Sequence, residues 1–229
     1  MKHRIKNLLK RILQKVTKSR WFYFLTKKTY PLSHIYGFDR GVPIDRYYIE
    51  NFLEKNKKFI KGNCLEILDN SYTTKFGNPT KSDILDINRD NKKATIHDDL
   101  RNLENIKENS YDCIILTQVL QFIDEYEKAI QECKRILKPC GTLLVTLPSI
   151  SRIDVASGVG NDFWRWTPAG ARYVFGKYFE KEKLEIRGFG DVLIGTGFWV
   201  GMAKHELNKK ELDHWDPNFP VLVTIKAQK

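Results

Sequence analysis

The sequence contains few cysteines, no long hydrophobic run, and no acidic residue among its first 30 positions. The longest apolar run near the start, Trp21-Phe-Tyr-Phe-Leu25, is too short to cross a bilayer or to form the core of a signal peptide. The cysteines form no C-x-x-C pair, and no paired histidines complete a zinc site. We therefore expect buried thiols in a reducing, cytoplasmic compartment at Cys64, Cys113, Cys133 and Cys140.

Two glycine-rich phosphate-binding motifs are also missing. Neither G-x-G-x-x-G nor G-x-x-x-x-G-K-[ST] occurs in the chain. Because such glycines let the backbone approach a pyrophosphate, their absence disfavours NAD and ATP and favours a nucleoside-type cofactor without a pyrophosphate. With 41% apolar and 12% aromatic residues, the 229-residue chain excludes disorder over its whole length and suits one globular domain with an appendage.

Positive charge is concentrated at the start of the chain. The first 30 residues hold ten lysines or arginines and no acidic residue, so the other 199 residues carry only 11 − 10 = +1 of the net charge. Within this basic arm, residues 1–30, helical spacing is kept by the apolar residues Met1, Ile5, Leu8, Leu9, Ile12, Leu13 and Val16. The pattern predicts an amphipathic helix with basic residues opposite an apolar face.

Three interpretations of the basic arm stay open. Residues 1–24 fit an anionic membrane surface, because lysines bind lipid phosphates and the aromatic run at 21–24 suits the interface. The helix can instead pack its apolar face on the body and leave its lysines in water. Nucleic-acid binding or a role as a targeting peptide is the third interpretation, although a mitochondrial transit peptide would favour Arg and Ser over Lys.

Strand-like and helical runs alternate along the remainder, residues 31–229. Residues 31–43 are typical of a linker, and Pro43 favours the start of a helix. Further helices are predicted over 129–138, over 168–179 with Thr167 as the cap, and over 198–207. Strands are predicted at 64–68, 83–87, 94–97, 111–117, 141–147, 184–187 and 221–225. This alternation indicates one α/β domain with a mostly parallel sheet covered on both faces.

Acidic residues follow several of the predicted strands. In open parallel sheets, ligands bind beyond the carboxyl ends of the strands, where the strand order reverses. Asp69, Asp83 or Asp86, and the pair Asp98 and Asp99 stand at such ends. One carboxylate after the second strand and another after the third form a pattern that can hold a ribose diol and an adenine amine.

Several of these segments resemble a known family. Leu65-Glu-Ile, Tyr111-Asp-Cys-Ile-Ile-Leu-Thr-Gln-Val-Leu and the run from Arg135 to Pro148 resemble the class I S-adenosylmethionine-dependent methyltransferases. The segments 40–50, 72–77 and 164–168 are similar to a bacterial subgroup often associated with cell-surface glycan pathways. The resemblance covers roughly residues 36–227. It implies a Rossmann-like, seven-stranded, mostly parallel sheet with helices on both faces, and S-adenosylmethionine as the cofactor.

The resemblance also assigns cofactor-binding residues, which are Glu66, Leu68, Asp69, Asn70, Asp83, Asp86, Asp99, Leu100, Thr117 and Gln118. The first four match the loop under the methionine moiety, and either Asp83 or Asp86 matches the ligand of the ribose hydroxyls. Asp99 and Leu100 match the pair that contacts adenine. The last two stand where the sulfonium and the acceptor meet.

Three departures from the family pattern accompany these matches. Leu68 and Cys140 each replace a glycine, and we expect both side chains to resist the left-handed backbone that glycine allows. The spacing from the first acidic turn to Asp99 is too short for full helices between the first three strands. These departures favour, as an alternative to an enzyme, a catalytically inactive partner in a glycan-assembly complex.

Methyl transfer to a hydroxyl gains from a nearby general base. The candidate bases are His34, Asp45, Asp162, His205 and His214. Asp162 together with Arg165 is the preferred catalytic pair, because its loop follows the fifth strand and can overhang the pocket. Trp164 and Trp166 can stack on a sugar ring or pack in the core.

The function that the sequence favours is O-methylation of a sugar in a cell-surface glycan or in its lipid-linked precursor. The acceptor would be a glycan or glycolipid, and the basic arm would hold the cytoplasmic enzyme at the inner face of the membrane. A nucleic-acid methyltransferase is a second alternative. The nearly neutral body and the sequence Thr117-Gln-Val-Leu120 argue against it, because base-amino enzymes carry a motif like Asn-Pro-Pro-Tyr there.

Overall fold

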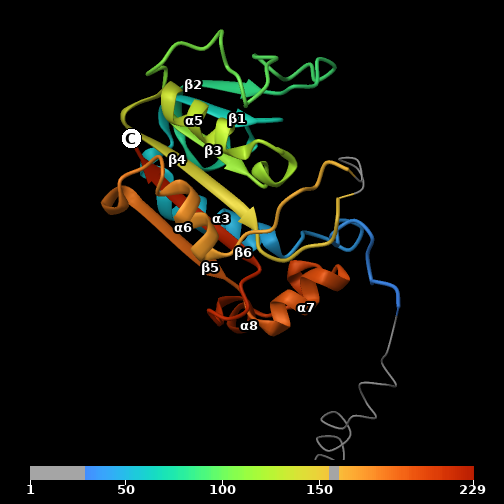
Figure 1. The fold of residues 1–229 in the computed structure, drawn as a ribbon. Coiled ribbons are helices and arrows are strands. Elements are labelled where there is room, and N and C mark those ends of the chain that lie inside the picture. Colours follow the sequence, from blue (N-terminus) through green and yellow to red (C-terminus); the bar gives the residue numbers. More distant parts are fainter. Residues whose placement is uncertain (1–28, 155–159) are drawn as a thin grey trace, which may run out of the picture. The chain divides into compact units, whose positions relative to one another are not determined.

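A computed structural model describes residues 29–154 and 160–229, so the helix predicted in the basic arm lies outside the described residues. The chain divides between Leu32 and Ser33, and the larger unit, Ser33–Lys229, contains a single sheet (Figure 1). Over the described ranges, no helix is both long enough and apolar enough to cross a membrane.

The sheet has six strands in the order β2-β1-β3-β4-β6-β5. Their bounds are Lys61–Ile67 (β1), Asn78–Leu85 (β2), Tyr111–Thr117 (β3), Leu137–Pro148 (β4), Leu184–Phe189 (β5) and Leu222–Gln228 (β6). The first four strands in that order are parallel, whereas β6 runs antiparallel to both β4 and β5. Strands covered on both faces need continuous apolar sequences, and β3 and β4 supply them.

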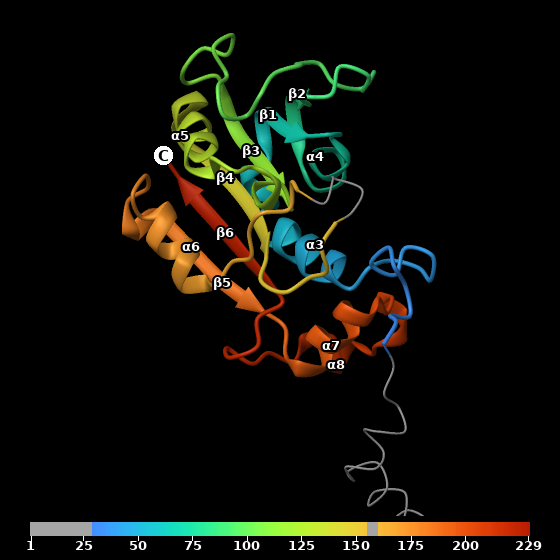
Figure 2. The same ribbon diagram turned by 45° about the vertical axis from the view of Figure 1, so that its right-hand side comes forward.

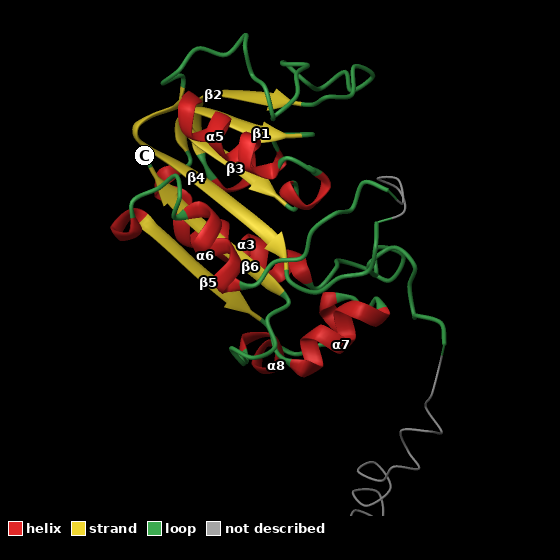
Figure 3. Cartoon of the chain, viewed as in Figure 1, coloured by secondary structure: helices red, strands yellow, loops and turns green. Residues whose placement is uncertain are grey.

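The predicted seventh strand, residues 94–97, is wrong. Only Ile96 contributes there, through a single parallel bridge to Leu85 at the end of β2. A parallel neighbour needs a crossover of about a dozen residues or more, and only ten residues separate these two positions. The predicted lack of full helices is confirmed: α4 (Ser71–Phe76) has six residues, and the β2–β3 connection has no helix (Figure 3).

Helices cover both faces of the sheet, as predicted. Buried side chains of α5 (Tyr126–Ile136) and α6 (Pro168–Phe175) share one core cluster with one face of the sheet. Those of α3 (Asp45–Asn56), α7 (Val192–Val200) and α8 (Lys209–Asp213) share a second cluster with the other face. In Figure 2, α5 and α6 accordingly lie on one side of the sheet and α3 on the other. Short 3₁₀ turns lie at Lys57–Phe59 (η1), Leu120–Phe122 (η2), Lys181–Lys183 (η4) and Lys204–Glu206 (η5).

Two predicted helix boundaries are wrong and one is confirmed. Pro43 does not begin a helix; it forms an isolated bridge with Ala203, and α3 begins at Asp45. The helix predicted over 198–207 instead ends at Val200, because Gly201 adopts a left-handed conformation (φ 81°) that terminates it. The cap at Thr167 is confirmed, since its side chain accepts the backbone N–H of Gly170.

The cysteine prediction holds for three of the four thiols. Cys64, Cys113 and Cys133 are buried, whereas Cys140 is exposed. Cys140 lies at a register shift near the start of β4, where its backbone has φ 65° and its side chain points into solvent. Burial raises the pKa of the Cys133 thiol to about 12, so this group is an inert part of the core.

Candidate functional site

A cavity of about 730 Å³ opens at the carboxyl ends of β1, β2 and β3. Leu68 follows β1, Asp86 follows β2, and Gln118 follows β3, and all three line this cavity. Strand order reverses between β1 and β3, which is the place where open α/β sheets bind ligands. The volume lies within the range of roughly 300–1,000 Å³ that is typical of small-molecule sites.

The lining of the cavity is strongly acidic. It contains two arginines, Arg46 and Arg101, and seven aspartates. The aspartates are Asp45, Asp86, Asp98, Asp99, Asp124, Asp154 and Asp162. A concave surface with this excess of carboxylates attracts a cationic ligand and repels an anionic one.

At the end of β2, the structure places Asp86 in the cavity and Asp83 elsewhere. The buried Asp86 carboxylate accepts the Asn88 N–H (2.9 Å) and the Asn91 side-chain amide (2.7 Å). Asp83 instead accepts the Tyr111 hydroxyl (2.9 Å) and borders a separate cleft. Successive side chains of a strand alternate between its two faces, so residues three positions apart point in opposite directions.

Beyond Ile96, the neighbours Asp98 and Asp99 have different surroundings. Arg101 holds Asp99 through its Nε (3.0 Å) and Nη2 (2.6 Å), and these bonds keep the pKa of Asp99 below its usual range. Asp98 accepts the Asp99 N–H through Oδ1 (2.9 Å), while its buried Oδ2 has no partner among the described residues. Asp98 is therefore the carboxylate still able to accept a donor from a ligand. The family pattern assigned this role to Asp99. In the structure, Arg101 bonds to the Asp99 carboxylate and leaves Asp98 as the available acceptor.

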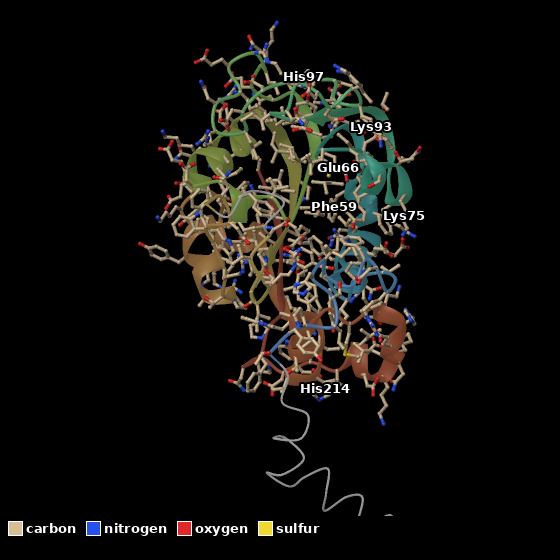
Figure 4. All side chains as sticks on the ribbon, turned by 90° about the vertical axis from the view of Figure 1, so that its right-hand side faces the viewer. Phe59, Glu66, Lys75, Lys93, His97 and His214 are labelled. Carbon is tan, nitrogen blue, oxygen red and sulfur yellow. The ribbon has the colours of Figure 1, made fainter. Side chains whose placement is uncertain are left out.

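Glu66 stabilises the segment that follows β1 through hydrogen bonds, and it does not line the cavity. Its carboxylate accepts the Tyr72 N–H (3.2 Å), the Thr73 N–H (2.8 Å) and the Thr73 hydroxyl (2.7 Å). Burial raises the pKa of Glu66 to about 6, and the bonds from Thr73 and Tyr72 only partly oppose this rise. In Figure 4, Glu66 lies inside the body, well away from His214 at the lower end.

Asp69 and Asn70 likewise point their side chains into the loop. Asp69 accepts the Ser71 N–H (2.9 Å), and the Asn70 side-chain amide donates to the Ser82 hydroxyl (3.2 Å). Of the ten residues assigned to cofactor binding, the structure therefore brings six to the cavity, namely Leu68, Asp86, Asp99, Leu100, Thr117 and Gln118. Glu66, Asp69, Asn70 and Asp83 lie outside its lining.

Backbone strain is concentrated around the cavity. Five described residues other than glycine have positive φ, and three of them line the cavity: Tyr36 (61°), Leu68 (71°) and Gln118 (56°). The expectation that Leu68 and Cys140 resist this conformation is wrong, because both adopt it. Such strain costs roughly 1–2 kcal/mol per residue and is found mainly where function requires a particular backbone path.

Replacing Leu68 or Cys140 with glycine should stabilise the fold in both cases but change ligand binding in only one. Each substitution removes left-handed strain, partly offset by the backbone entropy of glycine, so we expect a gain of up to about 1 kcal/mol. Leu68 lines the cavity, and its side chain is 60% exposed there, whereas Cys140 lies outside the lining. Chemical denaturation measures the first effect and calorimetric titration with S-adenosylhomocysteine the second. Equal affinity changes in both variants would contradict this assignment.

A second part of the cavity lining, which we call the far half, comes from the segment before α3 and from α3 itself. Tyr36 and Phe38 contribute aromatic rings, and Asp45 contributes a carboxylate that is only 8% exposed. Arg46 Nη1 lies 3.3 Å from Asp45 Oδ2, and the buried Oδ1 has no partner among the described residues. Burial raises the pKa of Asp45, and the nearby Arg46 opposes this only in part.

Asp162 and Arg165 form an ion pair at the rim of the cavity. Two bonds of 2.6 and 2.8 Å join them, and Asp162 also accepts the Asp154 N–H (2.9 Å). Burial raises the pKa of Asp162, but these bonds outweigh it and hold that pKa below its usual range. The pair joins two parts of the loop above the cavity, because Arg165 also donates to the Arg152 carbonyl (2.8 Å). Its catalytic role stays a prediction.

The other predicted candidates lie outside the lining. Trp166 is buried in the core, and Trp164 donates to the Ile123 carbonyl (2.9 Å) while remaining 38% exposed. None of the described histidines lines the cavity; His214, for example, bonds to Asp191 at 2.6 Å.

Gln121 is a cavity residue that the sequence did not reveal. Its side-chain amide donates to the Gln118 carbonyl (2.9 Å), its backbone carbonyl accepts the Phe163 N–H (2.8 Å), and its buried Oε1 has no described partner. A lone glutamine in a short 3₁₀ turn gives no sequence signal of such a role.

Comparisons with known proteins concern the domain and the fold. Residues 61–145 match the model of a family described as a methyltransferase domain. No curated protein matches the sequence. The structure is similar to an S-adenosylmethionine-dependent methyltransferase from Archaeoglobus fulgidus, with 13% identity and a TM-score of 0.53 over 80% of this chain and 94% of that one.

Two further structures give similar values. One is an S-adenosylmethionine-dependent methyltransferase from Thermotoga maritima, with 17% identity and a TM-score of 0.51 over 81% of this chain and 91% of that one. The other is the YcgJ protein from Bacillus subtilis, with 12% identity and a TM-score of 0.50 over 80% and 98%. Residues 61–145 thus match a methyltransferase domain, and the chain shares the fold of S-adenosylmethionine-dependent methyltransferases; together these findings support S-adenosylmethionine as the cofactor.

Proposed function

We propose that this chain transfers a methyl group from S-adenosylmethionine to a sugar hydroxyl in a cell-surface glycan or its lipid-linked precursor. The methyltransferase domain supports the reaction type, and the resemblance of segments 40–50, 72–77 and 164–168 supports the acceptor class. The observation that carries the proposal is the buried Asp45 carboxylate in the far half of the cavity, whose Oδ1 has no hydrogen-bond partner among the described residues.

The residues of the cavity fit S-adenosylmethionine. When bound, this cofactor supplies a methyl group activated by a sulfonium cation, and the excess of aspartates suits its positive charge. Asp86 would hold the ribose hydroxyls, and the buried Oδ2 of Asp98 would accept a donor from the adenine. Leu68 and Gln118, whose left-handed backbones flank the strand-order reversal, would enclose the methionine portion.

Asp45 would act as the general base for the acceptor hydroxyl. A hydroxyl is a weak nucleophile at neutral pH, and a positioned base contributes about 10²–10⁴-fold to the rate. The free Oδ1 can accept the hydroxyl proton, and its burial makes the carboxylate more basic than an exposed one. The rings of Tyr36, Phe38 and Phe163 offer flat apolar surfaces to the faces of a sugar.

Asp162 and Arg165 would hold together two described parts of the cavity rim. Their ion pair and the bond from Arg165 to the Arg152 carbonyl join the residues around Arg152 to those around Asp162, and would help to exclude water from the transfer site. The basic arm, residues 1–24 in particular, would hold the enzyme at the inner face of the membrane.

Incubation with S-adenosylmethionine labelled in its methyl group tests this function. A lipid-linked glycan fraction serves as the acceptor, and nucleic acid serves as the comparison. We expect label in an O-methyl sugar after hydrolysis and none in nucleic acid. Label in nucleic acid alone would overturn the proposal in favour of a nucleic-acid methyltransferase.

A catalytically inactive binding partner is the alternative, and the Leu68 side chain in the cavity is the observation that favours it. Calorimetric titration with S-adenosylhomocysteine separates the two functions. The enzyme should give a saturable heat, whereas an inactive relative with an obstructed cavity should give none.

A further inference from the structure

Helix α7 exposes three large apolar side chains to solvent. Its sequence, VLIGTGFWV, contains no charged residue. Val192 is 54% exposed, Leu193 46% and Trp199 53%. Positions 192 and 199 are seven residues apart, and position 193 adjoins 192, so the three lie on one side of the helix. We call these three residues the α7 face.

The opposite side of α7 is part of the body. Ile194 and Phe198 are buried, and Phe198 lines the far half of the cavity, where it stacks on Tyr36. Both ends of the helix are capped: Asp191 accepts the Ile194 N–H (2.8 Å), and Gly201 adopts the left-handed conformation. The exposed face therefore belongs to a fixed helix, and a single helix separates it from the cavity.

The larger unit begins, at Ser33, beside this helix. The Ser33 N–H donates to the Val200 carbonyl (3.2 Å), so the chain enters at the C-terminal end of α7 (Figures 1 and 2). At the other end, the Asp216 N–H donates to the Gly190 carbonyl (3.0 Å) and brings a loop with the exposed Trp215 near the helix. In the sequence, the 30 residues that begin the chain and end shortly before Ser33 carry ten basic and no acidic residues.

We propose that the α7 face lies against an anionic lipid bilayer. Tryptophan and aliphatic side chains are favoured at the boundary between headgroups and acyl chains, and the lysines and arginines of the first 30 residues would be attracted to anionic headgroups. The contact buries the apolar surface that α7 leaves in water. It also brings the wall of the cavity that contains Phe198 to the lipid, which suits a lipid-linked acceptor. That last consequence, unlike the contact itself, rests on the proposed function.

Co-sedimentation with vesicles tests the contact. The full chain is mixed with vesicles of phosphatidylcholine and phosphatidylglycerol, and the double variant Leu193→Ser, Trp199→Ser is compared with Tyr173→Ser. Tyr173 is 73% exposed on α6, which packs on the other face of the sheet, and so serves as a matched control. We expect the double variant to bind about tenfold more weakly and the control to bind like the unmodified chain. Equal binding by all three would overturn the proposal.

A second measurement identifies what covers the helix. Amide hydrogen exchange of residues 192–200 should slow when vesicles are added and should be unchanged, without vesicles, by deletion of residues 1–28. Faster exchange after the deletion would mean that the arm covers α7 and would overturn the membrane contact. Dimerisation of the full chain that the double variant abolishes, with vesicle binding intact, would overturn it as well. Titration of the same variants with S-adenosylhomocysteine tests the proposed function separately, because no residue of the α7 face lines the cavity.

Discussion

Replacing Asp45 with asparagine is expected to lower kcat by about 10²–10⁴-fold and to leave cofactor affinity nearly unchanged. Asparagine keeps the size of the side chain but cannot take up the acceptor proton. Asp45 lines the cavity from α3, whereas the residues proposed to hold the cofactor, Asp86 and Asp98, follow other elements, so we expect the cofactor to bind nearly as before. Steady-state kinetics and titration with S-adenosylhomocysteine measure the two effects. Asp213→Asn, a substitution of an exposed carboxylate on α8, is the matched control and should keep full activity.

The same substitution should make the fold more stable at neutral and alkaline pH. Burial raises the pKa of Asp45 in the folded state above its value in the unfolded chain. The contribution of this carboxyl to stability is therefore present at low pH and is lost as the pH rises through its folded pKa. Asparagine never ionises, so Asp45→Asn should exceed the wild type in unfolding free energy at pH 8 and approach it at pH 4. Loss of both activity and stability at pH 8 would contradict the assignment of Asp45 as the base.

Replacing Glu66 with glutamine should lower the free energy of unfolding by about 1–3 kcal/mol. The Glu66 carboxylate accepts three hydrogen bonds from Tyr72 and Thr73, and a glutamine turns an N–H group toward one of those donors. The loop that carries Leu68 should then loosen, and affinity for S-adenosylhomocysteine should fall as well. Urea denaturation and calorimetry measure the two effects.

The surface substitution Glu54→Gln is the control for Glu66→Gln. Glu54 is 54% exposed and pairs only with Lys57, so its loss should change stability by less than about 0.5 kcal/mol. Because the pKa of Glu66 is raised to about 6, wild-type stability should increase relative to Glu66→Gln as the pH falls from 7 toward 4.5. If the difference in unfolding free energy between the wild type and Glu66→Gln became smaller over this range, a buried, proton-binding carboxyl at position 66 would be contradicted.

Sequence patterns predicted the fold best where one local preference had no competitor. Strand β3 was predicted with its observed bounds, because its apolar, β-branched run has few alternatives in an α/β protein. The prediction of a helix over 198–207 was wrong because it rested on apolar spacing alone and did not consider that Gly201 ends the helix. The strand over 94–97 failed because a suitable local sequence cannot pair fully when the preceding connection is too short.

The candidate site was predictable only in the part that the sheet itself builds. The rule that ligands bind at strand ends pointed to Asp83 or Asp86 without coordinates, and the structure places Asp86 in the cavity. The family resemblance assigned Gln118, and Asp99 was expected after a strand over 94–97 that the structure reduces to one bridge. The far half depends on tertiary contacts that no local pattern reveals. The segment before α3 reaches the cavity because the Lys204 N–H donates to the Val42 carbonyl (2.7 Å), joining residues 162 positions apart.

Arg101 has a consequence for how selective the cavity is. Its guanidinium bonds to Asp99 on one side and, at 2.7 Å, to Asp124 on the other, so a single side chain joins two rims of the cavity. A ligand enlarged at this edge must displace Arg101 from both ion pairs, whereas one enlarged toward Phe38 meets an aromatic ring that is 55% exposed. Synthetic cofactors with a bulkier base should therefore be rejected more strongly than those with a bulkier transferable alkyl group.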